Sequence, residues 1–456
     1  MFVTHSSAYR IGIDGFSLAQ PRGTGVAAYG RILSFALRAL GHPVDVLYGI
    51  DIGRRTPPAL QEVLFFDSLD EDQDQIAPPL KPFSPRWFKE KATSWHDRTA
   101  FELTLSGRVE QRGFAGRMPV YDRILDSPRL FQRADRHFRQ TGRFLTITIP
   151  DTPRIMHWTS PLPIRARGAV NLYTVHDLAP LRFPDTAPED KQVQLRLLRT
   201  VCEQADGLCT LSESSARAIT SFCPEVAPRL VTTWQSVLPD GAAQNSNPQD
   251  SATEIYGSFG LRPDSYFLFF GSPGPRKTIG RLIEAFLAAQ TSRRLVLVGA
   301  TGWTNGEDLR LLKAGLASGR IVATEYLPQQ SLSALIRHAR GVVLPFVMEG
   351  SGLPVLEAMA MGTPVITSRE ASLPDITGEA AILMDAHDVS SITQGLETLD
   401  RDDALAARLR REGAVRAEFF SMARYQERLA HMYHRLMQNR HPVSDSPLQL
   451  RQQEGS

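Results

Sequence analysis

The sequence alternates short apolar runs with amphipathic helical patterns, and this alternation constrains the fold more than any other feature. In the first half, strand-like runs lie at 9–14, 43–49, 169–177, 207–212 and 229–234. A helical pattern at 25–41 separates the first two runs. Alternation of this kind predicts βαβ units and a parallel sheet.

The second half repeats the alternation after a polar stretch at 239–253, which is rich in Pro, Gly, Asn, Asp and Ser. Strand-like runs follow at 266–271, 294–299, 320–326, 341–346, 364–368 and 380–384. We interpret 239–253 as a linker between domains. The predicted fold class is α/β, with two Rossmann-like domains whose parallel sheets face each other across a cleft, a common place for a ligand site.

Residues 51–150 depart from the alternation and contain many Arg, scattered Pro and several aromatic residues. Basic and aromatic side chains mix over 81–145, where 126–145 reads as a basic helix with Leu130 and Phe138 on one side. Two interpretations stay open here. Such a segment can lie on an anionic membrane surface, or it can be a solvated helix face with ordinary core contacts.

Composition narrows the class of protein. The chain has 456 residues and a net charge of +2, too balanced to favour nucleic acid as a partner. Its three cysteines, Cys202, Cys209 and Cys223, follow no metal-binding spacing and indicate a reducing compartment. Neither a signal peptide nor a membrane-spanning run is evident. We therefore expect a cytoplasmic protein, either soluble or attached at the inner face of the cytoplasmic membrane.

A glycine-rich turn at 347–366 carries the strongest functional signal. After an apolar strand, Gly350 and Gly352 allow a tight turn that exposes backbone N–H groups. Pro354 suits the first turn of a helix, because its missing N–H is not needed there. The pattern predicts a helix over about 354–361 that ends at the next glycine.

Two glutamates flank this turn: Glu349 precedes the helix, and we place Glu357 in its first turn. A helix start favours an anion, whereas carboxylates facing that anion would repel it. The glutamates fit better as hydrogen-bond acceptors for hydroxyl groups beside a phosphate, and a nucleotide sugar supplies both. The alternative is a surface pair that only complements the helix dipole.

Two further turns support a phosphate ligand. Arg276 and Lys277 lie in a Gly/Pro turn between a strand and a helix, where two cations can neutralise a diphosphate. In the first half, a glycine turn at 21–25 opens the helix over 25–41. This turn is a weak signal alone, but three such turns on both sides of the linker favour a ligand between the domains.

The segments 271–288, 294–304 and 320–388 resemble the retaining glycosyltransferases of family 4, which have the GT-B fold. The resemblance includes the two glutamates with "GLPVLEAMAMGTPVI" and "LPDITGEAAILMD", and "RKT" where the family usually has Arg-Lys-Asn. In the first half, "GTGVAAYGRIL" and "LYTVHDLAPLRFP" are similar to the family's first domain.

The resemblance also implies a domain organisation. The first domain, on the acceptor side, would span 1–238 with an insert at about 51–150, and the nucleotide-sugar-binding domain would span 254–420. A helix at 421–437 would cross back to the first domain. The polar composition of 438–456 separately predicts a disordered tail.

Site residues of the second domain follow from the same resemblance. Glu357 would bind the ribose hydroxyls, and Glu349 would bind hydroxyls of the donor sugar near the reacting carbon. Arg276 and Lys277 would bind the diphosphate as it leaves. The backbone that lines the sugar and phosphate would come from Gly350, Ser351, Gly352 and Leu353. Tyr326 and Leu327 would lie near the base.

In the first domain, the resemblance implies that His176 contacts the sugar. The glycine turn of Gly23, Thr24 and Gly25 would approach the diphosphate or the acceptor from the opposite side. His176 alone is ambiguous, because a histidine after a strand is often a buried structural residue. Thr278 replaces the usual Asn, and Ser351 replaces a more common aromatic residue between the glycines.

The implied activity is a retaining, metal-independent hexosyl transfer without a cofactor. The sequence is most similar in style to bacterial mannosyltransferases of surface polysaccharide, so GDP-mannose is the expected donor, followed by UDP-glucose and dTDP-rhamnose. The expected acceptor is a glycan or lipid-linked oligosaccharide.

Other functions fit less well. A nicotinamide-dependent oxidoreductase would need a tight G-x-G-x-x-G after the first strand, which is absent. A pyridoxal-phosphate phosphorylase would need a Schiff-base lysine, and none stands out. A non-catalytic protein that binds nucleotide sugar stays open as an alternative.

Overall fold

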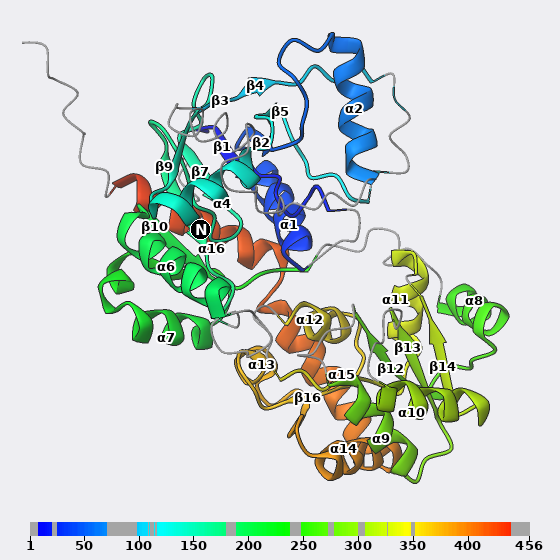
Figure 1. Ribbon diagram of the computed structural model, residues 1–456. Coiled ribbons are helices and arrows are strands. Elements are labelled where there is room, and N and C mark those ends of the chain that lie inside the picture. Colours follow the sequence, from blue (N-terminus) through cyan, green and yellow to red (C-terminus); the bar gives the residue numbers. More distant parts are fainter. Residues whose placement is uncertain are drawn as a thin grey trace, which may run out of the picture.

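The computed structural model divides into two α/β lobes (Figure 1). The first lobe contains the N-terminal half of the chain, and the second contains most of the C-terminal half. The structure describes residues 8–20, 25–70, 98–107, 109, 114, 116–178, 188–237, 248–271, 278–299, 306–325, 327–347 and 352–438.

An eight-stranded sheet forms the centre of the first lobe as described. In spatial order its strands are β11 (Leu230–Thr232), β10 (Gly207–Thr210), β9 (Val170–Thr174), β7 (Ile155–Trp158), β1 (Ile11–Asp14), β2 (Val44–Tyr48), β5 (Arg123–Asp126) and β4 (Phe101–Glu102). The pairs are parallel except for β4 with β5. The central strands are buried on both faces, as expected for a parallel sheet covered by helices. The expected strand positions of this half are confirmed.

Residues 51–150 contribute to this lobe more than the sequence indicated. β5 extends the main sheet beside β2, and a second, three-stranded sheet contains β3 (Arg98–Thr99), β6 (Leu145–Thr148) and β8 (Ile164–Ala166). In the described part of the N-terminal half, the helices are α1 (Gly25–Ala39), α2 (Pro58–Asp70), α4 (Leu130–Thr141), α6 (Pro188–Gln204), α7 (Glu213–Phe222) and the 3₁₀ helix η2 (Pro224–Arg229).

The basic helix expected over 126–145 is α4, and its apolar residues are buried. Leu130 and Phe138 pack into the core of the first lobe with Phe131 and Ala134. This helix therefore uses its apolar side for ordinary core contacts, which was one of the two alternatives. Most of the remaining basic and aromatic segment, 71–97, lies outside the described residues.

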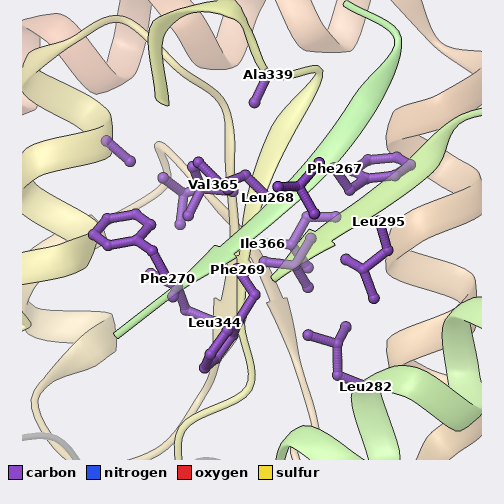
Figure 2. Close-up of a cluster of buried hydrophobic side chains, with 14 of the residues drawn as sticks. Phe267, Leu268, Phe269, Phe270, Leu282, Leu295, Ala339, Leu344, Val365 and Ile366 are labelled. Carbon is purple, nitrogen blue, oxygen red and sulfur yellow. The ribbon is translucent and has the colours of Figure 1, made fainter. Parts of the chain in front are cut away.

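The second lobe is built on a six-stranded parallel sheet. Its strands, in spatial order, are β14 (Ile321–Thr324), β13 (Arg294–Val298), β12 (Tyr266–Phe270), β15 (Gly341–Leu344), β16 (Val365–Ser368) and β17 (Ile382–Met384). The six expected strand positions are confirmed. Figure 2 shows the core around β12, where Phe267, Phe269, Leu295 and Ile366 are all completely buried.

Helices surround the six-stranded sheet of the second lobe. They are α8 (Pro248–Phe259), α9 (Ile279–Ala288), α10 (Gly306–Ala317), α11 (Gln329–His338), α12 (Leu353–Ala360), α13 (Leu373–Thr377), α14 (Val389–Arg401) and α15 (Asp403–Glu418). The start of α8 corrects the interpretation of 239–253 as linker throughout. Pro248 opens that helix, and Ile255 anchors it in the core, whereas the polar composition alone suggested a loop.

The last described helix, α16 (Met422–Gln438), belongs to the first lobe, although it follows α15 of the second lobe. Its residues Tyr425, Leu429, Met432 and Tyr433 are buried in the same apolar cluster as residues of α1 and β1. Figure 1 shows α16 within the first lobe. The chain therefore passes between the lobes at two places, once before α8 and once before α16.

Candidate functional site

The two lobes touch beside the carboxyl ends of their strands. In the second lobe, Asp375 of α13 accepts a hydrogen bond of 2.7 Å from the backbone N–H of Ser214 at the start of α7. Arg217 of the same helix lies 3.4 Å from this carboxylate. On the other side, Arg416 donates to the carbonyl oxygens of Asp375 and Ile376 at 2.6 and 2.8 Å. Asp375 thus connects the start of a first-lobe helix to α15.

The start of α12 lies at the same interface. Leu353, its first residue, is buried in the apolar cluster of the first lobe rather than that of its own lobe. Gly352 before it is left-handed, with φ of 57°, and a Cβ at this position would collide with Ile376 of α13. Only glycine combines this backbone with this close approach. Gly362 ends the segment with φ of 71°, as expected for a C-terminal stop.

Glu357 lies one turn along α12 from Leu353. The helix begins at Leu353, so Glu357 is its fifth residue and not part of the first turn, which corrects the expected position. Residues four apart lie on the same side of a helix. Glu357 is half-buried, and its spacing from Leu353 puts it on the side of α12 on which Leu353 packs against the first lobe.

The turn with Glu349, Gly350 and Ser351 lies outside the described residues, as do Arg276 and Lys277. Their roles stay predictions. The residues that border both segments are in contact, because Thr278 Oγ1 donates a hydrogen bond of 2.6 Å to the carbonyl oxygen of Pro345.

That bond joins two adjacent connections. Thr278 follows the Arg-Lys turn and precedes α9, and Pro345 follows β15. Since β12 and β15 are neighbours in the sheet, the chain leaves both strands at one edge. The two predicted binding turns therefore start from adjacent positions of the fold.

His176 follows β9 in the first lobe and is held from three sides. Its Nε2 lies 2.8 Å from the carbonyl oxygen of Thr159, and its own carbonyl oxygen accepts a bond of 2.8 Å from Ser215 Oγ. Its ring meets the ring of Tyr29 edge-on, with the centroids 5.1 Å apart. Burial lowers the pKa of His176, so the imidazole is neutral near pH 7.

The structure brings His176 close to the contact between the lobes. Ser215, which binds the His176 carbonyl, is the next residue after Ser214, whose N–H binds Asp375 of the second lobe. His176 and the segment of Gly352 to Ile376 therefore approach one another from opposite lobes.

The other predicted residues have less defined surroundings. Gly25 is exposed at the first position of α1, and a Cβ there would meet open space. Leu327 packs against the core of the second lobe, so its side chain serves that core. Gly23, Thr24 and Tyr326 lie outside the described residues.

Asp14 and Thr159 lie next to His176, and the sequence analysis did not identify either residue. Asp14 ends β1 with no exposed surface, and its carboxylate accepts hydrogen bonds from the backbone N–H and Oγ1 of Thr159 at 2.5 and 3.1 Å. Burial raises the pKa of Asp14 to about 6. An acidic residue at the end of an apolar strand was the available signal.

Among the described side chains, His, Cys, Asp and Glu nowhere form a group of three that could hold a metal ion. Within the same residues, no helix has the length and apolar character needed to cross a membrane.

Comparison with known proteins assigns the chain to a family. The family described as "Glycosyl transferases group 1" matches residues 264–402. The O-antigen chain mannosyltransferase B of Escherichia coli is 30% identical over 265 residues, which cover 57% of this chain and 68% of that protein. The serotype-specific mannosyltransferase WbdA of Escherichia coli is 26% identical over 272 residues, covering 58% of this chain but only 33% of that protein.

Solved structures agree on the fold. WaaG, a glycosyltransferase involved in lipopolysaccharide biosynthesis, aligns with a TM-score of 0.59 at 14% identity, over 92% of this chain and 99% of that one. HepE of Anabaena, solved with UDP and glucose, aligns with a TM-score of 0.60 at 13% identity, over 94% and 100%. These are GT-B glycosyltransferases, which confirms the predicted fold class. The chain belongs to the glycosyl transferases group 1 family.

Proposed function

We propose that this protein is a retaining, metal-independent hexosyltransferase that moves mannose from GDP-mannose to a growing glycan or lipid-linked oligosaccharide of a surface polysaccharide. The observation that carries the proposal is the approach of His176 to the segment of Gly352 to Ile376 across the lobe contact. In a chain of this family, that place would be occupied by the nucleotide sugar.

Electrostatics supports a diphosphate leaving group at this position. The start of α12 lies at the contact with the first lobe, and the N–H groups at a helix start favour negative charge. Arg276 and Lys277 would add two cations from the adjacent connection. Groups fixed in place before the reaction stabilise the charge that develops on the leaving phosphate, and this stabilisation commonly contributes most to such catalysis.

Hydroxyl recognition would come from the carboxylates and from His176. Glu357 lies on the first-lobe side of α12, where it would accept hydrogen bonds from the ribose. Glu349 would do the same for the sugar. In a retaining transfer the acceptor attacks on the face that the diphosphate leaves, and a phosphate oxygen takes the acceptor proton, so the chain need not supply a base.

The names of two relatives favour mannose as the sugar, since both are mannosyltransferases. The UDP and glucose of HepE belong to that protein, and the likeness at 13% identity supports the fold alone. UDP-glucose and dTDP-rhamnose are therefore the competing donors. The acceptor and any membrane contact follow only from the resemblance.

A thermal-shift comparison tests the donor. A ligand that binds only the folded protein raises its melting temperature, so GDP-mannose should raise it more than UDP-glucose or dTDP-rhamnose at equal concentration. A larger shift with either competitor would overturn the GDP-mannose assignment. Release of GDP from GDP-mannose on addition of a mannan oligosaccharide then separates a transferase from a protein that only binds nucleotide sugar.

A further inference from the structure

The orientation of His176 is set by the peptide group of Thr159. The 2.8 Å contact joins His176 Nε2 to a carbonyl oxygen, which can only accept a hydrogen bond. Nε2 therefore carries the proton of the neutral ring, and Nδ1 carries the lone pair. The edge-on contact with Tyr29 restrains the ring plane, and the Ser215 bond holds the His176 backbone.

Thr159 is itself fixed by Asp14. The Asp14 carboxylate receives two hydrogen bonds from this residue, 2.5 Å from its N–H and 3.1 Å from its Oγ1, and a third of 3.2 Å from the N–H of Phe16. Two bonds to one residue restrain both its backbone and its side-chain rotamer. Asp14 ends β1, Thr159 follows β7 and His176 follows β9, and these three strands are neighbours. The bonds thus run along the carboxyl edge of the sheet.

A purely structural role for Asp14 would be to satisfy two backbone N–H groups. A neutral side chain could do that at lower cost, because a carboxylate with no exposed surface loses its hydration. Its raised pKa, about 6, expresses this cost. The chain buries this carboxylate at the carboxyl end of β1, and titratable groups with perturbed pKa values are often found at functional sites.

We propose that Asp14 and Thr159 are positioning residues, which hold His176 with Nε2–H bound to the protein and Nδ1 presented as the acceptor for a ligand hydroxyl. The identity of that hydroxyl, on the donor sugar, rests on the proposed function. The geometry of the three residues does not.

Nuclear magnetic resonance of the full chain, labelled with ¹⁵N-histidine, tests the geometry without any nucleotide sugar. A hydrogen-bonded imidazole N–H exchanges slowly with water, so His176 should give an observable Nε2–H signal, assigned by its absence in His176→Asn. Thr159→Val removes the bond from Oγ1 to Asp14 and should broaden this signal, whereas Thr159→Ser should keep it. An unchanged signal in Thr159→Val overturns the proposal.

Turnover of GDP-mannose tests the consequence. Small displacements of a group that contacts the reacting substrate reduce rates strongly, so kcat/KM should fall about tenfold in Thr159→Val and return close to the wild-type value in Thr159→Ser. Thr363→Val is the matched control, because it removes a hydroxyl bond to the Ile336 carbonyl that is equally buried. Thr363 precedes β16 and so lies at the amino end of the six-stranded sheet, away from the predicted site. Equal losses in Thr159→Val and Thr363→Val would overturn the positioning role.

Asp14→Asn keeps the proposal testable where Thr159→Val does not fold. The amide oxygen still accepts the Thr159 N–H, but the amide nitrogen cannot accept from Oγ1, so both readouts should change less than in Thr159→Val. A wild-type signal together with wild-type turnover would count against the proposal. A perturbed signal in a protein that binds no nucleotide sugar would leave the positioning intact and refute only the proposed function.

Discussion

The two lobes share one architecture but place their polar groups differently. The first lobe buries Asp14, Asp45, Asp126 and His157 within or at the ends of its strands. In the described part of the second lobe, Arg340 is the one charged side chain that is buried to this degree. Around β12 that lobe has an apolar core (Figure 2). Apart from Glu357 on α12, the predicted ligand groups of the second lobe belong to the connections after its strands. The second lobe therefore separates binding residues from core residues more than the first lobe does.

The largest expected effect tests this separation in the second lobe. Lys277→Ala and Arg276→Ala remove cations predicted to stabilise the leaving diphosphate, and each should lower kcat by about 10²–10³. The melting temperature should change little, because these residues belong to a connection and not to the apolar core. GDP release measures the first quantity, and Arg262→Ala, an exposed arginine before β12, is the control. Near-normal turnover would refute the role of both cations.

The corresponding change in the first lobe should affect stability. His157 on β7 contacts Tyr433 of α16 through Nδ1 at 2.7 Å and Thr174 through Nε2 at 2.8 Å. His157→Phe leaves the buried Tyr433 hydroxyl without this partner, so the free energy of unfolding should fall by about 3 kcal/mol at pH 7.5. Urea denaturation measures this loss. Phe269→Leu in the second core is the apolar control, with a smaller loss.

At acidic pH, the difference in the free energy of unfolding between wild type and His157→Phe should become smaller. Burial lowers the pKa of His157 to about 3, below its ordinary value of 6.5. The stability from the neutral ring is therefore present above pH 6.5 and is lost as the pH falls toward 3. At pH 5 the difference should be smaller by about 2 kcal/mol. A difference independent of pH would mean that the imidazole is accessible to protons in the folded state.

Asp126 gives the opposite dependence on pH. It ends β5, its Oδ1 accepts the Ile50 N–H at 2.8 Å, and its buried Oδ2 has no hydrogen-bond partner within the described structure. Burial raises its pKa to about 8, so stability present below about pH 4 is lost as the pH rises through 8. Asp126→Asn avoids that loss and should be more stable by about 2 kcal/mol at pH 8.

The control for Asp126 lies on the neighbouring strand. Asp45 of β2 is also buried but forms ion pairs with Arg10 and Arg123 at 2.9 and 2.6 Å. Asp45→Asn removes the buried carboxylate that pairs with Arg10 and Arg123 and should destabilise the protein at pH 8, where Asp126→Asn stabilises it. Stability changes of the same sign in both variants would contradict this interpretation of the first lobe. Urea denaturation at pH 5 and pH 8 measures both.

The contact between the lobes should have a smaller effect. Asp375→Ala removes the acceptor for the Ser214 N–H and should lower the apparent affinity for GDP-mannose about fivefold, corresponding to about 1 kcal/mol for one charge-assisted bond. Arg217→Ala should have little effect, because this arginine is 68% exposed and its ion pair is screened. If Asp375→Ala binds GDP-mannose as wild type does, the contact does not support the site.

Local sequence patterns predicted the strands of the second lobe more completely than those of the first. Its strands are continuous apolar runs, and Gly352, Leu353 and Glu357 lie within one motif, so spacing alone placed them together. In the first lobe, Asp14 and Thr159 meet across 145 residues of sequence, which no local pattern can show. β5 was missed for a related reason: four residues within an Arg-rich segment become a strand only through their pairing with β2.

The smallest expected effect concerns Thr278, where the second lobe itself carries backbone strain. Its φ of 35° is left-handed, which is unfavourable for a β-branched residue, and its Oγ1 binds the Pro345 carbonyl at 2.6 Å. Asparagine adopts this conformation more readily and still offers a donor, so Thr278→Asn should raise stability by about 0.5 kcal/mol without loss of turnover. Thr278→Val keeps the strain but loses the bond. If Thr278→Val lowers kcat while the free energy of unfolding changes little, the bond between the two connections serves catalysis, as we expect for this lobe. If only the free energy of unfolding falls, the bond is structural, like the buried polar bonds of the first lobe.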